Sequence, residues 1–208
     1  SIAARLMAGE PMSAFELKSA EPNHIAVKEA VLPFARFPGV DTLLGPEMRS
    51  TGEVMGLDTT FERAFLKAQM GAGVKLPDHG TCFMSIKDAD KGALMLEAAT
   101  TLSAIGFTIL ATDGTAAWLA ENAVESTRVK KAHEGRPNIV DEMKNGNVQI
   151  VFNTTEGAQS IDDSREIRRV ALYDKIPYYT TAAGSRAAAL AMRNRLEGEI
   201  TVTALQAL

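Results

Sequence analysis

The chain has 208 residues, 46% of them hydrophobic, and a formal net charge of -4. This length allows one large domain or two small ones, each with a proper core. The small negative charge gives no electrostatic reason to expect nucleic-acid binding, and no apolar run reaches the roughly 18 residues that a membrane-spanning helix needs. The single cysteine, Cys82, excludes an internal disulfide framework and favours a reducing, cytoplasmic location.

The first predicted elements are the end of a helix and an extended segment. Residues 1–9 predict the last turns of a helix that ends at Gly9, because glycine commonly follows a helix in the left-handed conformation. This start has neither an initiator methionine nor the pattern of a signal peptide, so we expect a piece of a longer protein. Residues 25–34 predict an extended segment that Pro33 interrupts.

Residues 36–56 form the most constrained stretch of the sequence. Two prolines and four glycines force repeated turns, so this run cannot be one regular element. Glu47, Arg49 and Glu53 alternate between the turns like one face of a strand. These three side chains could be catalytic carboxylates and a phosphate clamp, but we favour ion pairs that hold the irregular backbone.

A helix is predicted after this run. Thr59 and Glu62 stand at the spacing of a capping box, in which two side chains satisfy free N–H groups at a helix start. Apolar side chains then recur at helical spacing until Gly71; they are Phe61, Ala64, Phe65 and Ala68. Residues 71–80 have the composition of a linker, and we place a domain boundary there, between residues 74 and 75.

Beyond this boundary, short apolar strands alternate with helices. We predict strands at residues 82–86, 107–111, 126–130, 148–152 and 177–180, and helices at residues 90–105, 115–122, 139–145, 164–174 and 183–196. Strands that alternate with helices of this length form βαβ units around a parallel sheet, so the expected fold class is α/β.

Ligands of such sheets bind at the carboxyl ends of the strands, in the loops that lead into helices. Four of these loops carry hydroxyl groups, an amide and lysines; they are residues 85–91, 112–115, 130–137 and 153–157. Helix starts offer free N–H groups, threonines donate hydrogen bonds and lysines add positive charge, so the loops favour a phosphate group. Asp113 and His133 are the only candidates there for a base or a metal ligand, and His133 fits a structural role in a turn better.

Residues 36–56 and four later motifs carry a family resemblance. The motifs are residues 112–115, 133–137, 153–157 and 163–169. The run 36–56 resembles, almost residue for residue, the segment that closes the second ATP-grasp half of carbamoyl phosphate synthetase large subunits. The four motifs stand at the spacing of that family's methylglyoxal-synthase-like regulatory domain.

This resemblance covers the whole chain and implies its organisation. Residues 1–74 would be a small, partial α+β segment that ends the ATP-grasp half. Residues 75–208 would form a three-layer regulatory domain around a five-stranded parallel sheet.

The resemblance further implies a regulatory site. The domain would bind nucleoside monophosphates, with UMP as inhibitor and IMP as activator, through side chains at the family's motif positions: Lys91, Thr112, Thr115, Lys131, Asn153, Thr154 and Thr155. Ornithine would bridge this domain and the synthetase half near Tyr178 and Thr180. No catalytic residue, metal site or cofactor is expected within this chain, which alone would be non-catalytic.

The parent enzyme that the resemblance implies is an ATP-dependent ligase. It makes carbamoyl phosphate from bicarbonate, glutamine and ATP for pyrimidine and arginine biosynthesis. ATP and Mg²⁺ or Mn²⁺ would bind elsewhere in that enzyme, which pairs with a glutamine amidotransferase small subunit in the cytoplasm. We expect no nucleic-acid or membrane partner.

Simpler interpretations of these residues stay open. Lys91 and Lys131 could be solvated surface charges, as most lysines are, and residues 153–155 could cap the helix that follows. Asp113 stands where enterobacterial members of the family carry histidine, so it places a carboxylate near the phosphate and weakens anion binding. The small alanines of residues 180–184 leave ornithine binding open as well.

Two other functions need residues of a different kind. A methylglyoxal synthase-like lyase acting on a triose phosphate needs an aspartate in a Gly-Asp pair, whereas residues 135–141 read GRPNIVD. A dinucleotide-dependent oxidoreductase needs a Gly-x-Gly-x-x-Gly turn after a strand, and the sequence has none. The lyase is therefore kept only as the alternative to a regulatory module.

Overall fold

The computed structural model describes residues 2–16, 23–32, 52–154 and 164–204. Its helices are α1 (Ile2–Met7), α2 (Phe61–Gly71), α3 (Ala93–Ala104), α4 (Asp113–Glu121), α5 (Ile139–Lys144), α7 (Arg165–Tyr173) and α8 (Ala182–Glu197). Its strands are β1 (Ile25–Val31), β2 (Gly52–Asp58), β3 (Thr81–Ser85), β4 (Thr108–Ala111), β5 (Thr127–Arg128), β6 (Ile150–Asn153) and β7 (Tyr178–Tyr179). None of the helices in this described part combines the length and the apolar character that crossing a membrane requires.

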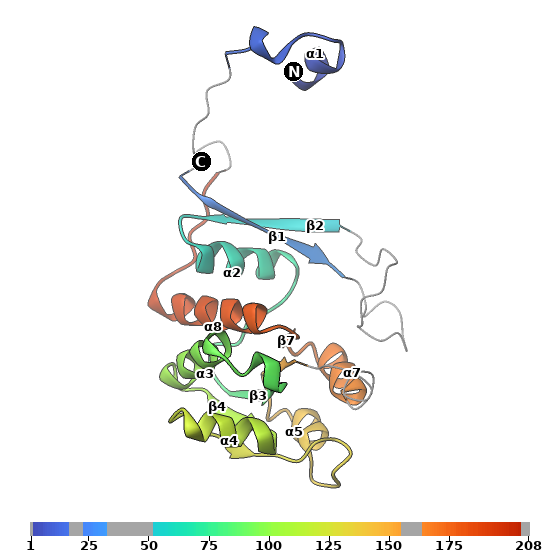
Figure 1. Cartoon of the computed structure of the whole chain (residues 1–208), viewed down its shortest axis with the longest axis vertical. Coiled ribbons are helices and arrows are strands. Elements are labelled where there is room, and N and C mark those ends of the chain that lie inside the picture. Colours follow the sequence, from blue (N-terminus) through green and yellow to red (C-terminus); the bar gives the residue numbers. More distant parts are fainter. Residues whose placement is uncertain (1, 17–22, 33–51, 155–163, 205–208) are drawn as a thin grey trace.

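Five parallel strands form the larger sheet, in the order β5-β4-β3-β6-β7. The predicted α/β class and five-stranded parallel sheet are therefore confirmed. Helices cover both faces (Figure 1): α3 and α8 lie on one face, and α5 and α7 on the other. Every strand and helix predicted after residue 80 is present, and its bounds differ from the prediction by at most three residues.

Successive side chains of the strands enter two separate cores. Cys82 and Met84 of β3 face the layer of α3 and α8, while Phe83 between them faces α5 and α7. All three side chains are fully buried. Burial raises the pKa of the Cys82 thiol well above its ordinary value, so this cysteine is an uncharged core residue.

A smaller antiparallel sheet, β1–β2, packs on α2, and α2 packs on α8 (Figure 1). Gly56 of β2 makes the first of these contacts possible. A Cβ atom at Gly56 would lie 2.0 Å from the Ala64 carbonyl oxygen and 2.5 Å from the Ala68 backbone nitrogen. The strand therefore touches the backbone of α2, an approach that only glycine allows.

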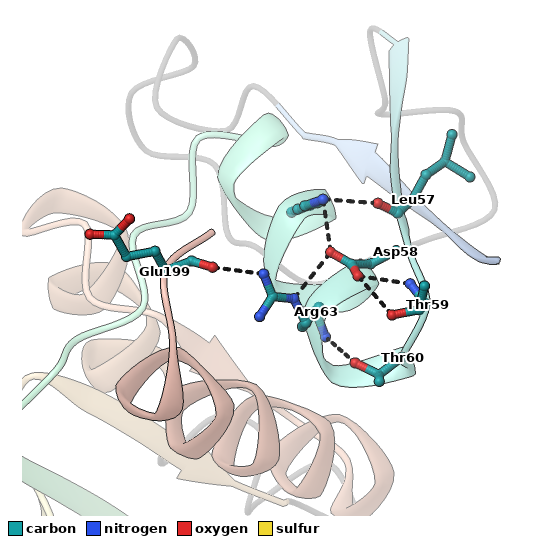
Figure 2. A network of polar contacts seen from close by, with 7 residues as sticks. Leu57, Asp58, Thr59, Thr60, Arg63 and Glu199 are labelled. Atoms are coloured by element: carbon teal, nitrogen blue, oxygen red, sulfur yellow. Dashed lines mark hydrogen bonds and ion pairs between the residues drawn. The ribbon is translucent and has the colours of Figure 1, made fainter. Parts of the chain in front are cut away.

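α2 shares a core with the layers of the larger sheet. Its side chains Phe65 and Leu66 belong to the same buried cluster as those of α3 and α8. Arg63 of α2 also reaches the segment after α8, where its Nη2 donates to the Glu199 carbonyl oxygen at 2.7 Å (Figure 2). The predicted boundary between residues 74 and 75 thus lies between elements that pack together, and it stays a prediction.

The start of α2 differs from the predicted capping box, which was wrong by one residue. Thr60 is the N-cap, since its Oγ1 accepts from the Arg63 N–H at 3.4 Å (Figure 2). The backbone N–H and the hydroxyl of Thr59 donate instead to the Asp58 carboxylate, at 2.7 and 3.3 Å. Because both donors of Thr59 are bonded to Asp58, Thr60 is the N-cap instead. A capping box would then need its acidic residue at position 63, one residue after Glu62.

The two predicted elements of the N-terminal part are present. α1 ends as expected, since Gly9 has a φ of +95° and its N–H donates to the Leu6 carbonyl oxygen. β1 occupies most of the predicted extended segment 25–34, and Pro33 lies outside the described residues.

Of the constrained run 36–56, the described part is its end, residues 52–56, which belongs to β2. Glu53 forms an ion pair with Lys28 of β1, with 2.5 Å between Nζ and Oε2, and both side chains are exposed. This contact agrees with the ion-pair interpretation of Glu53. Glu47 and Arg49 lie outside the described residues.

Candidate anion-binding site

The strand order creates a switch point at the centre of the larger sheet. The chain leaves β3 toward β4 on one side and leaves β6 toward β7 on the other, so the switch point lies between the carboxyl ends of β3 and β6. Ligands of open α/β sheets bind at such a point, and we call the place between these two strand ends the crevice. The loops that follow β3, β4 and β6 begin at this crevice. They carry most of the residues that the sequence predicted for an effector site.

Backbone hydrogen bonds extend the sheet by one residue at this end. The Thr112 N–H donates to the Met84 carbonyl oxygen at 3.2 Å, and the Thr154 N–H donates to that of Ser85 at 3.0 Å. These bonds hold Thr112 and Thr154 on either side of the end of β3, where their exposed fractions are 5% and 3%. The predicted loops after β4 and β6 are therefore brought together around β3.

Two buried threonine hydroxyls support the loop that leaves β3. Thr115 Oγ1 accepts from the Ile86 N–H at 2.9 Å, and Thr154 Oγ1 accepts from the Lys87 N–H at 3.0 Å. The Thr112 hydroxyl donates to Thr115 Oγ1 at 3.2 Å. The hydroxyls of Thr115 and Thr154 each keep their own hydrogen to donate, so they both shape the loop and can serve an anion.

Lys91 places a positive charge over the start of α4. A Cβ atom at Gly114 would lie 3.6 Å from Lys91 Nζ, so the ammonium group lies close to the first turn of that helix. The Lys91 side chain is only 17% exposed, and its Nζ lies 2.7 Å from Oδ1 of Asp88, a side chain that is 95% exposed. The hydrogen bond from Lys91 lowers the pKa of the Asp88 carboxyl.

The charges around α4 favour an anion between Lys91 and the helix. The first N–H groups of α4 have no acceptors within the helix and form the positive end of its dipole. The Lys91 ammonium group adds a second positive charge at the same end. Asp113 in the first turn and Asp88, which is paired with Lys91, partly offset this charge, but both carboxylates are exposed to water. An anion bound here would contact the N–H donors of α4 and the half-buried Lys91 side chain together.

Asn153, at the end of β6, has both amide hydrogens engaged within the protein. Its Nδ2 donates to Tyr178 OH at 2.6 Å and to Ser164 Oγ at 3.0 Å, and the residue is 1% exposed. Asn153 thus ties the end of β6 to β7 and to the start of α7. It positions the elements behind the crevice and does not direct its N–H groups toward a ligand.

Lys131 lies in a turn that follows β5 and therefore starts at the same end of the sheet. Its side chain is exposed, and its backbone N–H donates to Glu134 Oε2 at 2.8 Å. Asn138 holds the turn together, because its Nδ2 donates to the carbonyl oxygens of Ala132 and Gly135 at 3.2 and 2.9 Å. The structure fixes the backbone around Lys131 by these bonds.

The remaining predicted residues have varied surroundings. Thr155 lies outside the described residues, and His133 is exposed in the Lys131 turn. Tyr178, on the ornithine side of the prediction, is half-buried and bonded to Asn153, while Thr180 after it is exposed. The structure thus brings Lys91, Thr112, Thr115 and Thr154 together at the crevice, with Asn153 and Tyr178 behind them.

The sequence interpretation missed a chain of polar side chains on the other face of β7. Tyr179 OH donates to Gln69 Oε1 at 2.9 Å, and Gln69 Nε2 donates to Glu29 Oε2 at 2.9 Å. Burial raises the pKa values of Tyr179 and Glu29, so the tyrosine hydroxyl keeps its proton. The available signal was Gln69 itself, a polar residue on the apolar side of α2, where it is 4% exposed.

Comparisons with known proteins agree with this fold. Residues 94–180 match the family described as MGS-like domain. The carbamoyl phosphate synthase large chain of Rhizobium meliloti is 54% identical over 211 residues, which cover 99% of this chain and 18% of the relative. The large chains of Brucella suis and Synechocystis are 53% and 48% identical; each alignment covers 99% of this chain and 18% or 19% of the relative.

The chain thus spans less than a fifth of the length of these curated relatives. The family resemblance inferred from residues 36–56 and from the later motifs is confirmed. Over 99% of its length the chain is therefore similar to a segment of carbamoyl phosphate synthase large chains, and within it residues 94–180 match the MGS-like domain.

Proposed function

We propose that this chain is the regulatory segment of a carbamoyl phosphate synthase large chain and that it binds a nucleoside monophosphate. The phosphate group would lie between Lys91 and the first turn of α4, with the hydroxyls of Thr115 and Thr154 beside it. The observation that carries this proposal is the Lys91 side chain, which is only 17% exposed and holds its ammonium group over a helix start that already carries partial positive charge. UMP and IMP are the effectors that the family resemblance implies.

The rest of the proposal concerns the longer protein of which this chain covers a part. That protein would be a glutamine-dependent ligase that uses ATP and Mg²⁺ or Mn²⁺ to make carbamoyl phosphate for pyrimidine and arginine biosynthesis. It would act in the cytoplasm together with a glutamine amidotransferase small subunit. Residues 75–208 would form the regulatory domain, with ornithine bound near Tyr178 and Thr180.

Regulation requires contacts between the effector site and the part that it controls. β7 supplies such contacts, because Tyr178 is bonded to Asn153 beside the crevice and Tyr179 is bonded to Gln69 of α2. Gln69 in turn is bonded to Glu29 of β1. Coupling free energies between two sites are typically about 1–3 kcal/mol, a magnitude that a few such bonds can supply.

The test is the melting temperature of the chain with UMP or IMP at millimolar concentration. Either nucleotide should raise it, because a ligand that binds only the folded state stabilises that state. Lys91→Ala and Lys131→Ala should each remove most of the rise. Lys144→Ala removes an exposed lysine of α5 and serves as the matched control, which should keep the full rise. An unchanged melting temperature with both nucleotides would refute the site, as would an equal loss in the Lys144 variant.

A triose phosphate lyase would use a similar phosphate site but also needs a carboxylate base. In the stretch compared with that family, Asp141 is engaged at the start of α5, where its Oδ2 accepts from the Asn138 N–H at 3.0 Å. This carboxylate serves as a helix cap, so the geometry favours the regulatory function. Release of methylglyoxal from a triose phosphate by the purified chain would reverse that choice.

A further inference from the structure

A polar cavity lies between β2, α2 and the segment that follows α8. Its volume is about 340 Å³, and it is formed by elements other than the loops of the nucleotide crevice. Asp58, Arg63 and Lys67 line it from β2 and α2, His24 from the residue before β1, and Thr201 and Thr203 from the segment after α8.

The Asp58 carboxylate in this cavity is already saturated with donors (Figure 2). One oxygen accepts from the N–H and the hydroxyl of Thr59, and the other lies 3.2 Å from Arg63 Nε and 2.8 Å from Lys67 Nζ. Burial opposes ionisation of this group, but the hydrogen bonds from Lys67, Thr59 and Arg63 outweigh it and lower the pKa of Asp58 to about 2. Asp58 is therefore an anion near neutral pH, and both of its oxygens already accept hydrogen bonds from the protein.

Arg63 and Lys67 keep donors that no described group uses. Arg63 donates from Nε to Asp58 and from Nη2 to the Glu199 carbonyl oxygen. Three of its five N–H groups therefore have no acceptor among the described residues. Lys67 donates to Asp58 and to the Leu57 carbonyl oxygen, which leaves one N–H. Figure 2 shows the Glu199 carboxylate directed away from Arg63. The two cations thus outnumber the one described carboxylate of the lining.

His24 adds an independent sign of a missing partner. Its Nδ1 is buried and has no hydrogen-bond partner, and it is the one side-chain atom of this kind among the described residues. Buried polar atoms without a partner are rare in folded proteins and often mark an unoccupied place for water or an ion. His24 also lines the cavity together with Arg63 and Lys67, so its ring reports on the same space as their free donors.

We propose that this cavity binds a phosphate-type oxyanion, either free or carried by a small organic molecule. The anion would accept from Arg63 and Lys67, neutralise the excess positive charge of the lining and lie near the His24 ring, which lines the same cavity. A guanidinium group with several free N–H groups suits such an anion, because it can make two parallel hydrogen bonds to the same group. The bound anion would connect β1, α2 and the segment after α8, and this site is separate from the nucleotide site proposed above.

The test follows the His24 side chain by NMR while inorganic phosphate is added at constant pH and ionic strength. The chain has three histidines, and His24→Asn assigns the signal. We expect a saturable shift of the His24 signal at millimolar phosphate. Arg63→Gln and Lys67→Gln should each weaken binding about tenfold or more, because each removes a charge-assisted hydrogen bond. Methyl phosphate, titrated in parallel, distinguishes a free anion from an organic phosphate by which of the two binds more tightly.

Two control variants separate this site from other effects. Lys144→Gln makes the same change of charge on α5 and should leave the His24 titration unchanged. Lys91→Ala disables the nucleotide crevice and should also leave it unchanged. If Arg63→Gln does not fold, as judged by its melting curve, Lys67→Gln decides the question, since it keeps the contacts of Arg63 with Asp58 and Glu199. The proposal is wrong if sodium chloride produces the same shift, if the shift does not saturate, or if Lys144→Gln weakens it equally.

Discussion

Replacing Gly56 by alanine should separate β2 from α2. The added Cβ atom would lie 2.0 Å from the Ala64 carbonyl oxygen and 2.5 Å from the Ala68 nitrogen, whereas ordinary contact begins at 3.4 Å. Both neighbours are helix backbone, so neither can rotate away as a side chain would. The strand must instead move by more than an ångström, and the Val54 side chain, which packs against Gly71, must move with it.

The loss of folding free energy that this movement causes can be estimated from similar contacts. Overpacking a closely packed contact usually costs about 1–3 kcal/mol, and a clash with fixed backbone belongs at or above the upper end. A loss of about 3 kcal/mol lowers the melting temperature of a chain of this size by roughly 6–12 °C. The same loss should appear in urea unfolding as a lower midpoint with an unchanged slope.

Gly52 provides the matched control, because it lies on the same strand and a Cβ atom there would meet nothing within 4 Å. Gly52→Ala should therefore change the free energy of unfolding by no more than about 0.5 kcal/mol. If Gly56→Ala melted at the same temperature as Gly52→Ala, the close approach of β2 to α2 would not exist in solution.

Three further measurements test other contacts. The pKa of Asp58 is about 2 in the folded protein and 3.8 ordinarily, so ionised Asp58 contributes about 1–2 kcal/mol to the free energy of unfolding above pH 4. This contribution is lost as the pH falls toward 2, and urea titrations of Asp58→Asn at several pH values should lack this part of the acid dependence. Tyr179→Phe should cost about 1–3 kcal/mol, because it leaves the buried Gln69 oxygen without its donor, and the cost should shrink in a Gln69→Leu background. Thr115→Val should cost about 1–2 kcal/mol by removing the acceptor of the Ile86 N–H, while Thr115→Ser should restore it; equal melting of the Val and Ser variants would contradict this role.

The repeating part of the fold could be predicted from the sequence because it depends on local patterns. The segments predicted as strands have four or five residues each and alternate with helices, and this alternation predicts a parallel sheet even where the bounds of single elements are uncertain by a few residues. The helix starts were harder to predict, because side chains compete for the same donors. At α2, Asp58 takes the N–H and hydroxyl of Thr59, and a sequence motif cannot show that a strand ends with its carboxylate beside the cap.

At the candidate site, the positions of residues could be predicted from the sequence but their individual roles could not. The positions of Thr112, Thr115 and Thr154 follow from the rule that ligands bind at the carboxyl ends of parallel strands. Their individual roles do not follow from it, since Thr115 and Thr154 accept hydrogen bonds from the β3 loop. Asn153 was expected to line the site, yet its amide hydrogens are bonded to side chains 11 and 25 residues further along the chain. Contacts over such separations leave no periodic trace in a sequence.

The two neighbouring tyrosines of β7 show how much depends on strand register. Val151 pairs with Tyr178 and Phe152 with Tyr179, so one ring faces the α5–α7 layer and the next faces α8 and α2. A slip of one residue along β6 would exchange the rings between the two faces and break the bonds to Asn153 and Gln69 in a single step. A strand of only two residues thus fixes the polar contacts on both faces of the sheet, and a change of register would break the contacts on both faces together.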